Sequence, residues 1–197
     1  MCLLLESIRV ENKIAEALEY HQERVDSACK LLFGNIPKLD LFSLIESQSI
    51  PGNGLYKCRI VYDKRVRDIQ FIPYKIKEIK SVKLIETGAF AYNYKFLDRS
   101  FFEKLILQNP DYDELILMRN GEITDSCFSN LAFYNGDKWL TPERPLLEGT
   151  RRQRLIDQQR ISPASLHVSN IKDFKKISFI NAMLDLGDLT VDVSSDD

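Results

Sequence analysis

The sequence predicts an α+β fold in two lobes, and three observations lead to this prediction. The chain has 197 residues, 44% of them hydrophobic, which is enough for one domain or for two small lobes that each bury a core. Strand-like segments gather before and after a few helical segments, an arrangement typical of α+β proteins. The groups meet near Gly88 to Tyr92, so we expect a small first lobe at residues 1–87 and a larger second lobe at residues 88–197.

The first lobe is expected to open with a strand and a helix. Residues 3–10 alternate in the manner of a strand, which is expected to turn at residues 11–13 into a segment from Ile14 to Leu18. Apolar residues at helical spacing predict a helix from Tyr20 to Phe33, ended by Gly34. A second short helix is expected at about Leu39 to Ser47, before a turn at residues 51–54 that contains one proline and two glycines.

Three further strands are expected after this turn, at Leu55 to Tyr62, Arg67 to Pro73 and Ser81 to Ile85, and they suggest a meander on the first lobe. The same stretch is basic, with nine lysines and arginines against three acids between Lys57 and Lys83. Such a stretch could face an anion or a nucleic acid. We favour a solvated strand face, because the bases alternate with apolar residues and no aromatic and glycine recognition motif accompanies them.

The second lobe is predicted to mix helices and strands. A helix is expected from Arg99 to Gln108, and a basic helix from about Gly149 to Gln159. A hairpin turn is expected at Asn120-Gly121. The predicted strands are Leu115 to Met118, Asn130 to Tyr134, Lys138 to Leu140, Lys176 to Ile180 and Leu189 to Val193, and a frayed acidic tail is expected from residue 194.

Composition and motifs exclude several classes of protein. No run of 18 apolar residues is present, so we expect no membrane span and a cytoplasmic protein. The four cysteines are scattered and there are only two histidines, which argues against a disulfide framework and a metal site. The glycine-rich nucleotide-binding motifs and the serine-hydrolase and zinc-protease motifs are also missing.

Four segments remain that could carry chemistry. Lys95 lies between two aromatic residues, which can free its amine as a nucleophile by desolvation, although an ordinary lysine at a strand end reaches solvent. His21 and Arg24 are three residues apart on a predicted helix and can share a face, where an arginine can clamp a phosphate, although such pairs are usually surface residues.

The other two segments lie in the second lobe. Asp125 follows the predicted hairpin, where its carboxylate could pair with a protonated ring nitrogen or merely satisfy turn amides. Gly149 precedes a predicted helix, whose first amides can seat a phosphate or form a plain helix start.

Taken in order, these segments resemble the motifs of the class IV aminotransferases, the fold-type IV pyridoxal-phosphate enzymes. Glu6-Ser7-Ile8-Arg9 resembles the E-T-x-R strand of that family, and His21-x-x-Arg24 resembles its H-x-x-R motif. Lys95-Phe96-Leu97-Asp98-Arg99 is similar to the K-x-x-N-R form typical of its lyase branch. The remaining similarities are Asp125-x-x-x-x-Asn130 to E-x-x-x-x-N, residues 147–152 to L-x-G-[IT]-x-R, and Phe179-Ile180-Asn181-Ala182 to a second phosphate loop.

The resemblance implies a cofactor, pyridoxal 5'-phosphate, and a role for each matching residue. Lys95 is implied to be the Schiff-base lysine and general base, Asp125 to hold the pyridine nitrogen, and Arg24 to bind the phosphate. Arg59, on a strand of the first lobe, could face the substrate or solvent. The phosphate is implied to be held also by backbone amides of Thr150, Arg151, Asn181 and Ala182.

The resemblance leaves the reaction open between two chemistries. The lysine motif and the Asn-Ala form favour 4-amino-4-deoxychorismate lyase, which eliminates pyruvate and gives 4-aminobenzoate for folate synthesis. An amino acid aminotransferase of the branched-chain or D-amino acid type is the alternative, and a non-catalytic binding protein on the same scaffold is a third. The resemblance also implies a homodimer and a small-molecule substrate, without a nucleic acid or membrane partner. Two departures matter: Asp125 stands where most members have glutamate, and the scaffold is shortened.

Overall fold

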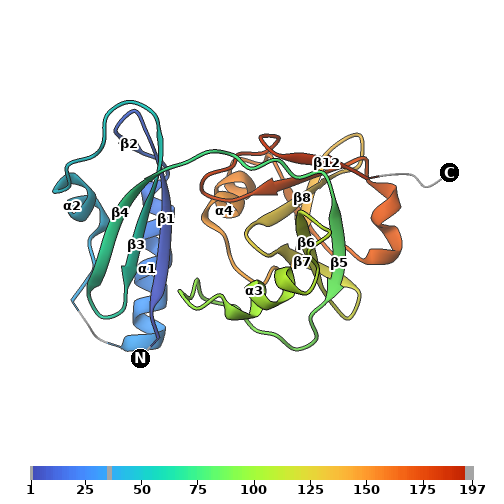
Figure 1. Ribbon diagram of the computed structural model, residues 1–197, viewed down its shortest axis with the longest axis horizontal. Coiled ribbons are helices and arrows are strands. Elements are labelled where there is room, and N and C mark those ends of the chain that lie inside the picture. Colours follow the sequence, from blue (N-terminus) through green and yellow to red (C-terminus); the bar gives the residue numbers. More distant parts are fainter. Residues whose placement is uncertain (1, 35–36, 194–197) are drawn as a thin grey trace. The chain divides into compact units, whose positions relative to one another are not determined.

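The computed structural model describes residues 2–34 and 37–193, so the expected acidic tail from residue 194 lies outside the described part. The chain forms two compact units of mixed helix and sheet (Figure 1). The first unit comprises Met1–Lys75 and Tyr94–Asp98, and the second comprises Ile76–Asn93 and Arg99–Asp197. The predicted α+β class is confirmed.

The first unit is a four-stranded antiparallel sheet with two helices, in the strand order β2-β1-β3-β4. Its elements are β1 (Leu4–Glu11), β2 (Ile14–Ala15), α1 (Leu18–Phe33), α2 (Leu41–Glu46), β3 (Leu55–Tyr62) and β4 (Val66–Pro73). Strand β2 lies in the segment expected after the turn at residues 11–13. The other five correspond to predicted elements, because each has a clear apolar period and a turn residue near its end.

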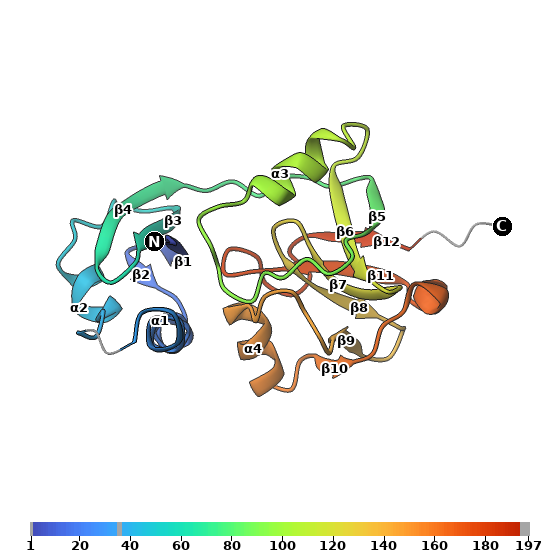
Figure 2. The same ribbon diagram turned by 90° about the horizontal axis from the view of Figure 1, so that it is seen from below.

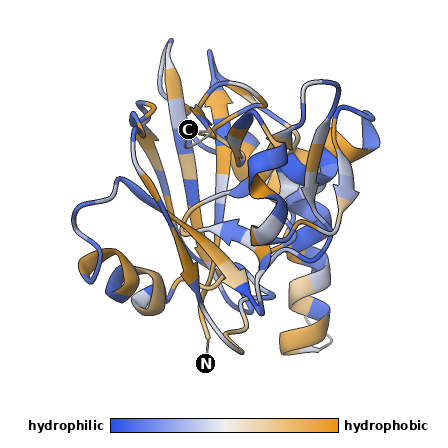
Figure 3. Ribbon diagram, turned by 90° about the vertical axis from the view of Figure 1, so that its right-hand side faces the viewer, coloured by the Kyte–Doolittle hydropathy of each residue, from blue (hydrophilic) through white to orange (hydrophobic). Residues whose placement is uncertain are grey.

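The core of the first unit lies between this sheet and α1. Burial alternates strictly along β1, so that Leu4, Ile8 and Val10 face inward. They belong to one apolar cluster with Val25 and Ala28 of α1. Hydrophobic and hydrophilic stretches occur on the same ribbons, as one-sided burial requires (Figure 3).

Residues 94–98 return to the first unit and extend along β1. The Leu5 amide donates to the Lys95 carbonyl at 2.9 Å, and the Leu97 amide donates to the Leu3 carbonyl at 2.9 Å. Leu4 and Phe96 form an antiparallel bridge between these two bonds. Lys95 is therefore fixed through its backbone beside the strand that carries Glu6.

The second unit contains a five-stranded sheet in the order β10-β9-β8-β11-β12 and a three-stranded sheet in the order β5-β6-β7 (Figure 2). Its elements are β5 (Val82–Glu86), α3 (Ser100–Leu107), β6 (Glu114–Arg119), β7 (Glu122–Ser126), β8 (Asn130–Tyr134), β9 (Trp139–Pro142), α4 (Thr150–Asp157), β10 (Ser162–Ala164), a 3-10 helix (Val168–Asp173), β11 (Lys176–Ile180) and β12 (Thr190–Asp192). Strand β7 was not among the predicted strands, although the turn that precedes it was expected at Asn120-Gly121. Strand β10 and the 3-10 helix were not predicted either, because both are short and lack apolar periodicity.

The expected meander on the first lobe is wrong in its last strand. Strand β5 pairs with β6 in parallel and belongs to the second unit. The division accordingly falls between Lys75 and Ile76, earlier than the expected boundary at residues 87 and 88, and the short return at residues 94–98 was not foreseen. The basic stretch from Lys57 to Lys83 is therefore split between the units rather than lying on one strand face. Parallel pairing joins segments far apart in sequence, so local periodicity does not reveal it.

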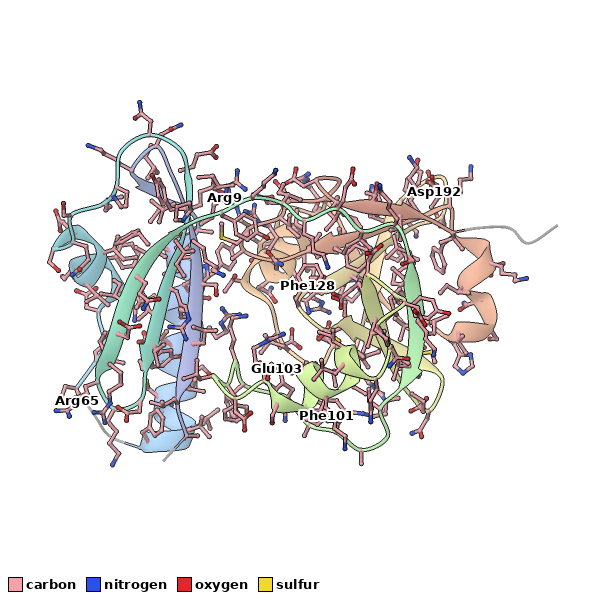
Figure 4. All side chains as sticks on the ribbon, in the orientation of Figure 1. Arg9, Arg65, Phe101, Glu103, Phe128 and Asp192 are labelled. Atoms are coloured by element: carbon pink, nitrogen blue, oxygen red, sulfur yellow. The ribbon has the colours of Figure 1, made fainter. Side chains whose placement is uncertain are left out.

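Aromatic stacking consolidates the second unit near the turn that follows β7. The ring of Phe128, labelled in Figure 4, stacks on Phe179 of β11 with centroids 6.0 Å apart. Phe179 is fully buried and belongs to the apolar cluster of this unit. Among the described residues, no helix is long and apolar enough to cross a bilayer.

Candidate functional site

In the first unit, a buried carboxylate gathers the two residues singled out on the predicted helix. Glu6 lies at an inward position of β1 and is fully buried. Its Oε2 accepts hydrogen bonds from His21 Nδ1 and Arg24 Nη2, each at 2.6 Å, while its Oε1 accepts from Arg24 Nε at 2.9 Å. His21 and Arg24 therefore share one face of α1, as predicted, and the Arg24 guanidinium is held in two places.

The charges of this cluster are strongly coupled. Burial alone raises the pKa of Glu6, but Arg24 and His21 outweigh it and lower this pKa to about 2. Burial lowers the pKa of His21, against the influence of Glu6, and the positive charges of Arg24 and Lys95 lower it further. Glu6 is therefore anionic at neutral pH, and it supplies the counter-charge that keeps Arg24 in a fixed orientation.

Lys95 belongs to the same cluster through its electrostatic influence on His21. Lys95 is half-buried, and hydrogen bonds fix its backbone beside β1. The structure therefore brings two predicted site residues, Arg24 and Lys95, into one neighbourhood of the first unit.

Arg59 lies on β3 and takes part in a different interaction. Its Nη1 lies 3.4 Å from Asp68 Oδ2 on β4, and the side chain is 26% exposed. Arg59 thus takes part in a partly exposed ion pair, and its suggested role in substrate binding stays a prediction.

In the second unit, Asp125 lies near the end of β7 and is 4% exposed. Its Oδ1 accepts a hydrogen bond from Asn130 Nδ2 at 2.7 Å, and its Oδ2 accepts from the Leu147 amide at 2.9 Å. Burial raises the pKa of Asp125 to about 7, although these donors and Arg152 act in the opposite direction. A carboxylate in these surroundings gains from any positive charge brought to it.

The turn before α4 is built as the sequence suggests. Gly149 is the N-cap residue and gives no side-chain cap, so the first turn of α4 depends on other partners for its amides. Thr150 and Arg151 are the first two residues of this helix, and both are buried.

Arg151 joins this turn to the loop after β11. Its Nη2 donates to the Ala182 carbonyl at 3.3 Å, and its Nη1 lies 3.5 Å from Asp185 Oδ2. Asn181 closes the loop, because its Oδ1 accepts from the Met183 amide at 2.8 Å and its backbone pairs with Leu184. The second unit thus brings together five predicted site residues: Asp125, Thr150, Arg151, Asn181 and Ala182.

Sequence reasoning gave no role to three residues that the structure places in these clusters: Glu6, Asn130 and Arg152. Glu6 could have been found as an acid at an inward position of an alternating strand, where burial demands a partner. Arg152 is 4% exposed, donates to the Pro142 carbonyl, and keeps its Nε buried without a hydrogen-bond partner in the described structure. Arg152 ends the segment that resembles L-x-G-[IT]-x-R, but nothing in the local sequence shows that its side chain is buried while that of Gln153 is exposed. Within the described residues, no group of three or more histidine, cysteine or acidic side chains could hold a metal ion.

A comparison with models of known protein families shows which family the chain is related to. The family model for amino-transferase class IV matches residues 3–190. The chain belongs to the class IV aminotransferase family. The resemblance carried by the sequence motifs is therefore confirmed, and so is the fold-type IV architecture.

Individual relatives of this class IV aminotransferase family member include proteins of similar length. An uncharacterised protein of Haemophilus influenzae is 32% identical over 182 residues, which cover 91% of this chain and 97% of the relative. A crystal structure from Haemophilus somnus 129PT, of a proposed 4-amino-4-deoxychorismate lyase, has a TM-score of 0.88 at 30% identity and covers 94% of this chain and 98% of that one. The shortened scaffold is thus shared with these relatives.

A more distant structure shows the same fold with the cofactor of the family. The pyridoxal-phosphate-bound form of a hypothetical aminotransferase from Mycobacterium tuberculosis has a TM-score of 0.75 at 17% identity. It covers 98% of this chain and 80% of that one. Its longer chain agrees with the expectation that many members carry additional segments.

Proposed function

We propose that this class IV aminotransferase family member uses pyridoxal 5'-phosphate and acts as a 4-amino-4-deoxychorismate lyase, which eliminates pyruvate and gives 4-aminobenzoate. The observation that carries the proposal is Asp125, a buried carboxylate whose partners include two neutral N–H donors and whose pKa is raised to about 7. Such a carboxylate fits the protonated ring nitrogen of this cofactor, since the added positive charge offsets the cost of its burial.

The other site residues also fit the parts of the cofactor. Arg24 presents a guanidinium whose orientation Glu6 fixes, and the start of α4 provides amides in the arrangement that binds phosphate. We propose that Arg24 and the backbone amides of Thr150, Arg151, Asn181 and Ala182 bind the phosphate. These contacts would fix the plane of the ring.

Each residue then has a part in the reaction. When bound, the cofactor withdraws electrons from the substrate carbon that bears the amino group. Lys95 would hold the cofactor through Nζ, and its amine would move the proton to and from that carbon. Asp125 would keep the ring nitrogen protonated.

The lyase reaction is supported more strongly than transamination. The relative with the TM-score of 0.88, covered over nearly its whole length, is a proposed lyase. The Lys95 motif and the Asn181-Ala182 pair also have the forms typical of that branch. The product would serve folate synthesis, and we further propose that the protein is a cytoplasmic homodimer.

The test begins with the visible absorbance spectrum of purified protein after addition of pyridoxal phosphate. Wild type is expected to gain a yellow band that borohydride fixes covalently, whereas Lys95→Ala gains none. Lys80→Ala is the matched control, because its side chain is 77% exposed. A colourless wild type would overturn the enzyme proposal in favour of a binding protein.

The reaction is then identified with two substrate assays. Release of pyruvate and 4-aminobenzoate from aminodeoxychorismate, lost in Lys95→Ala, is expected for the lyase. Conversion of amino acids with 2-oxo acids, without activity on aminodeoxychorismate, would replace the lyase by an aminotransferase.

A further inference from the structure

The side chain of Asn130 links the buried acid of the second unit to the turn before α4. Asn130 begins β8 and is 5% exposed. Its Nδ2 donates to Asp125 Oδ1 at 2.7 Å and to the Leu147 carbonyl at 2.8 Å. Both neighbours are acceptors, so the amide orientation is determined by its partners. The two protons of this one group are thus shared between the acid and the turn.

The other side of the amide lies against Gly149. A Cβ added to Gly149 would overlap Asn130 Oδ1 and would lie 3.1 Å from its Cγ. Gly149 has φ −80° and ψ 140°, values that any residue adopts. The glycine is therefore required by the close approach of Asn130 and not by its own backbone conformation.

The backbone of Asn130 adds a third connection. Asn130 pairs in register with Ile180, the last residue of β11. Ile180 directly precedes Asn181 and Ala182, the loop that accepts a hydrogen bond from Arg151. One residue therefore touches the acid, the turn before α4 and the strand that ends at the second loop.

We propose that Asn130 is a positioning residue that sets the distance between the acid that holds the cofactor ring and the turn that holds its phosphate. This inference rests on the proposed function, because it needs a ligand with a cationic ring nitrogen and a phosphate. A rigid ligand of that kind gains affinity when its two contacts are held at the correct separation before binding.

The first test is a double-mutant cycle on apo protein and needs no cofactor. Gly149→Ala is expected to lower the thermal midpoint of unfolding in wild type, because the new methyl group displaces Asn130. In the Asn130→Ala background the same substitution is expected to destabilise much less, because the space is vacated and only the lower preference for alanine at an N-cap position remains. Equal destabilisation in both backgrounds would overturn the contact on which the proposal depends.

The second test measures the dissociation constant of pyridoxal phosphate by absorbance titration. Asn130→Ala and Gly149→Ala are each expected to weaken binding roughly 10–100-fold, the range that follows when a buried hydrogen bond is lost. The double variant is expected to bind no more weakly than either single variant. Unchanged binding in Asn130→Ala, or losses that multiply in the double variant, would overturn the proposal.

Asn130→Asp separates positioning from mere space filling and covers the case in which the alanine variant folds poorly. It keeps the shape of the side chain but replaces the donor group that faces Asp125 Oδ1 and the Leu147 carbonyl by an acceptor. We expect a similar loss of affinity at pH 8 and partial recovery at pH 5, where one protonated carboxyl again donates. Wild-type affinity at both pH values would show a space-filling role only. If wild type itself binds no pyridoxal phosphate, the proposed function fails instead.

Discussion

Glu6 in the first unit and Asp125 in the second are both removed from solvent, with 0% and 4% exposure. Their pKa values are nevertheless shifted in opposite directions from the ordinary values. Burial raises the pKa of each. At Glu6 the cation Arg24 and the donor His21 outweigh burial and bring the pKa to about 2. At Asp125 the hydrogen bonds from Asn130 and Leu147 do not outweigh burial, and the pKa is raised to about 7.

The comparison shows that the charge of the hydrogen-bond partners, more than burial, decides the pKa of a buried carboxylate. Glu6 has the partners of a structural carboxylate, and Asp125 has those of a carboxylate that can bind a cationic ligand. Glu6 has its cation within the chain, so its negative charge is already compensated. The cation that acts on Asp125 is Arg152, whose guanidinium donates hydrogen bonds to Glu148 and to the Pro142 carbonyl rather than being held by Asp125 alone. A protonated ring nitrogen would provide the missing charge.

Breaking the Glu6 cluster is expected to have the largest effect on stability. Glu6→Gln leaves Arg24 and His21 without their anion, so we expect the free energy of unfolding to fall by roughly 3–5 kcal/mol at pH 7. Urea denaturation of apo protein measures it. Glu78→Gln, with a side chain 82% exposed, is the control and should change the value by less than about 0.5 kcal/mol. A loss no larger than that of the control would show that Glu6 does not anchor the cluster.

Removal of the Asp125 carboxylate is expected to slow the reaction. Asp125→Ala should lower kcat roughly 10²–10³-fold, because the ring nitrogen loses its anionic partner. Steady-state kinetics with saturating cofactor measures the change. Asp111→Ala, at an exposed position, should leave kcat unchanged. An Asp125→Ala variant with wild-type kcat would refute the assigned role of this acid.

The two acids are also expected to give opposite dependences of apo stability on pH. The pKa of Asp125 is raised from 3.8 to about 7, so its contribution is present below about pH 4 and is lost as the pH rises through about 7. The pKa of Glu6 is lowered from 4.5 to about 2, so its contribution is present above pH 4.5 and is lost as the pH falls through about 2.

Difference curves of unfolding free energy against pH test this pair of signs. The penalty of Asp125→Ala relative to wild type should shrink between about pH 4 and about pH 7. The penalty of Glu6→Gln should shrink only at acid pH, between about 4.5 and about 2. Two parallel curves would contradict the contrast between the two sites.

The smallest effect is expected at Arg59, whose ion pair with Asp68 is partly exposed. Arg59→Ala should lower the free energy of unfolding by less than about 1 kcal/mol. Its KM gives a separate readout: an increase in KM at unchanged kcat would support the substrate role suggested by the sequence, and an unchanged KM would remove it.

Much of the fold was predictable because local signals were strong. Helix α1 follows from apolar residues at helical spacing and from Gly34, and β1 from strict alternation. The partner of β5 was not predictable, because parallel pairing with β6 joins distant segments. The two-lobe division was misplaced for the same reason.

The site shows the same limit at the level of single residues. Arg24, Lys95 and Asp125 could be predicted as site residues because they fall in ordered motifs that resemble a known family. Asn130 was part of such a motif but received no role, since its contacts with Leu147 and Gly149 depend on the three-dimensional approach of two loops. The pKa difference between Glu6 and Asp125 likewise arises from neighbours that are distant in sequence.

The return of residues 94–98 to β1 has a consequence for biogenesis. A fragment ending at Lys75 would carry Glu6, His21 and Arg24 but would lack the strand-like segment that contains Lys95. On the ribosome, the first unit can be completed only after residue 98 has emerged, when β5 of the second unit has already been synthesised. No single cleavage of the chain separates this protein into its two intact units. The segment that returns to the first unit contains Lys95, the proposed catalytic lysine.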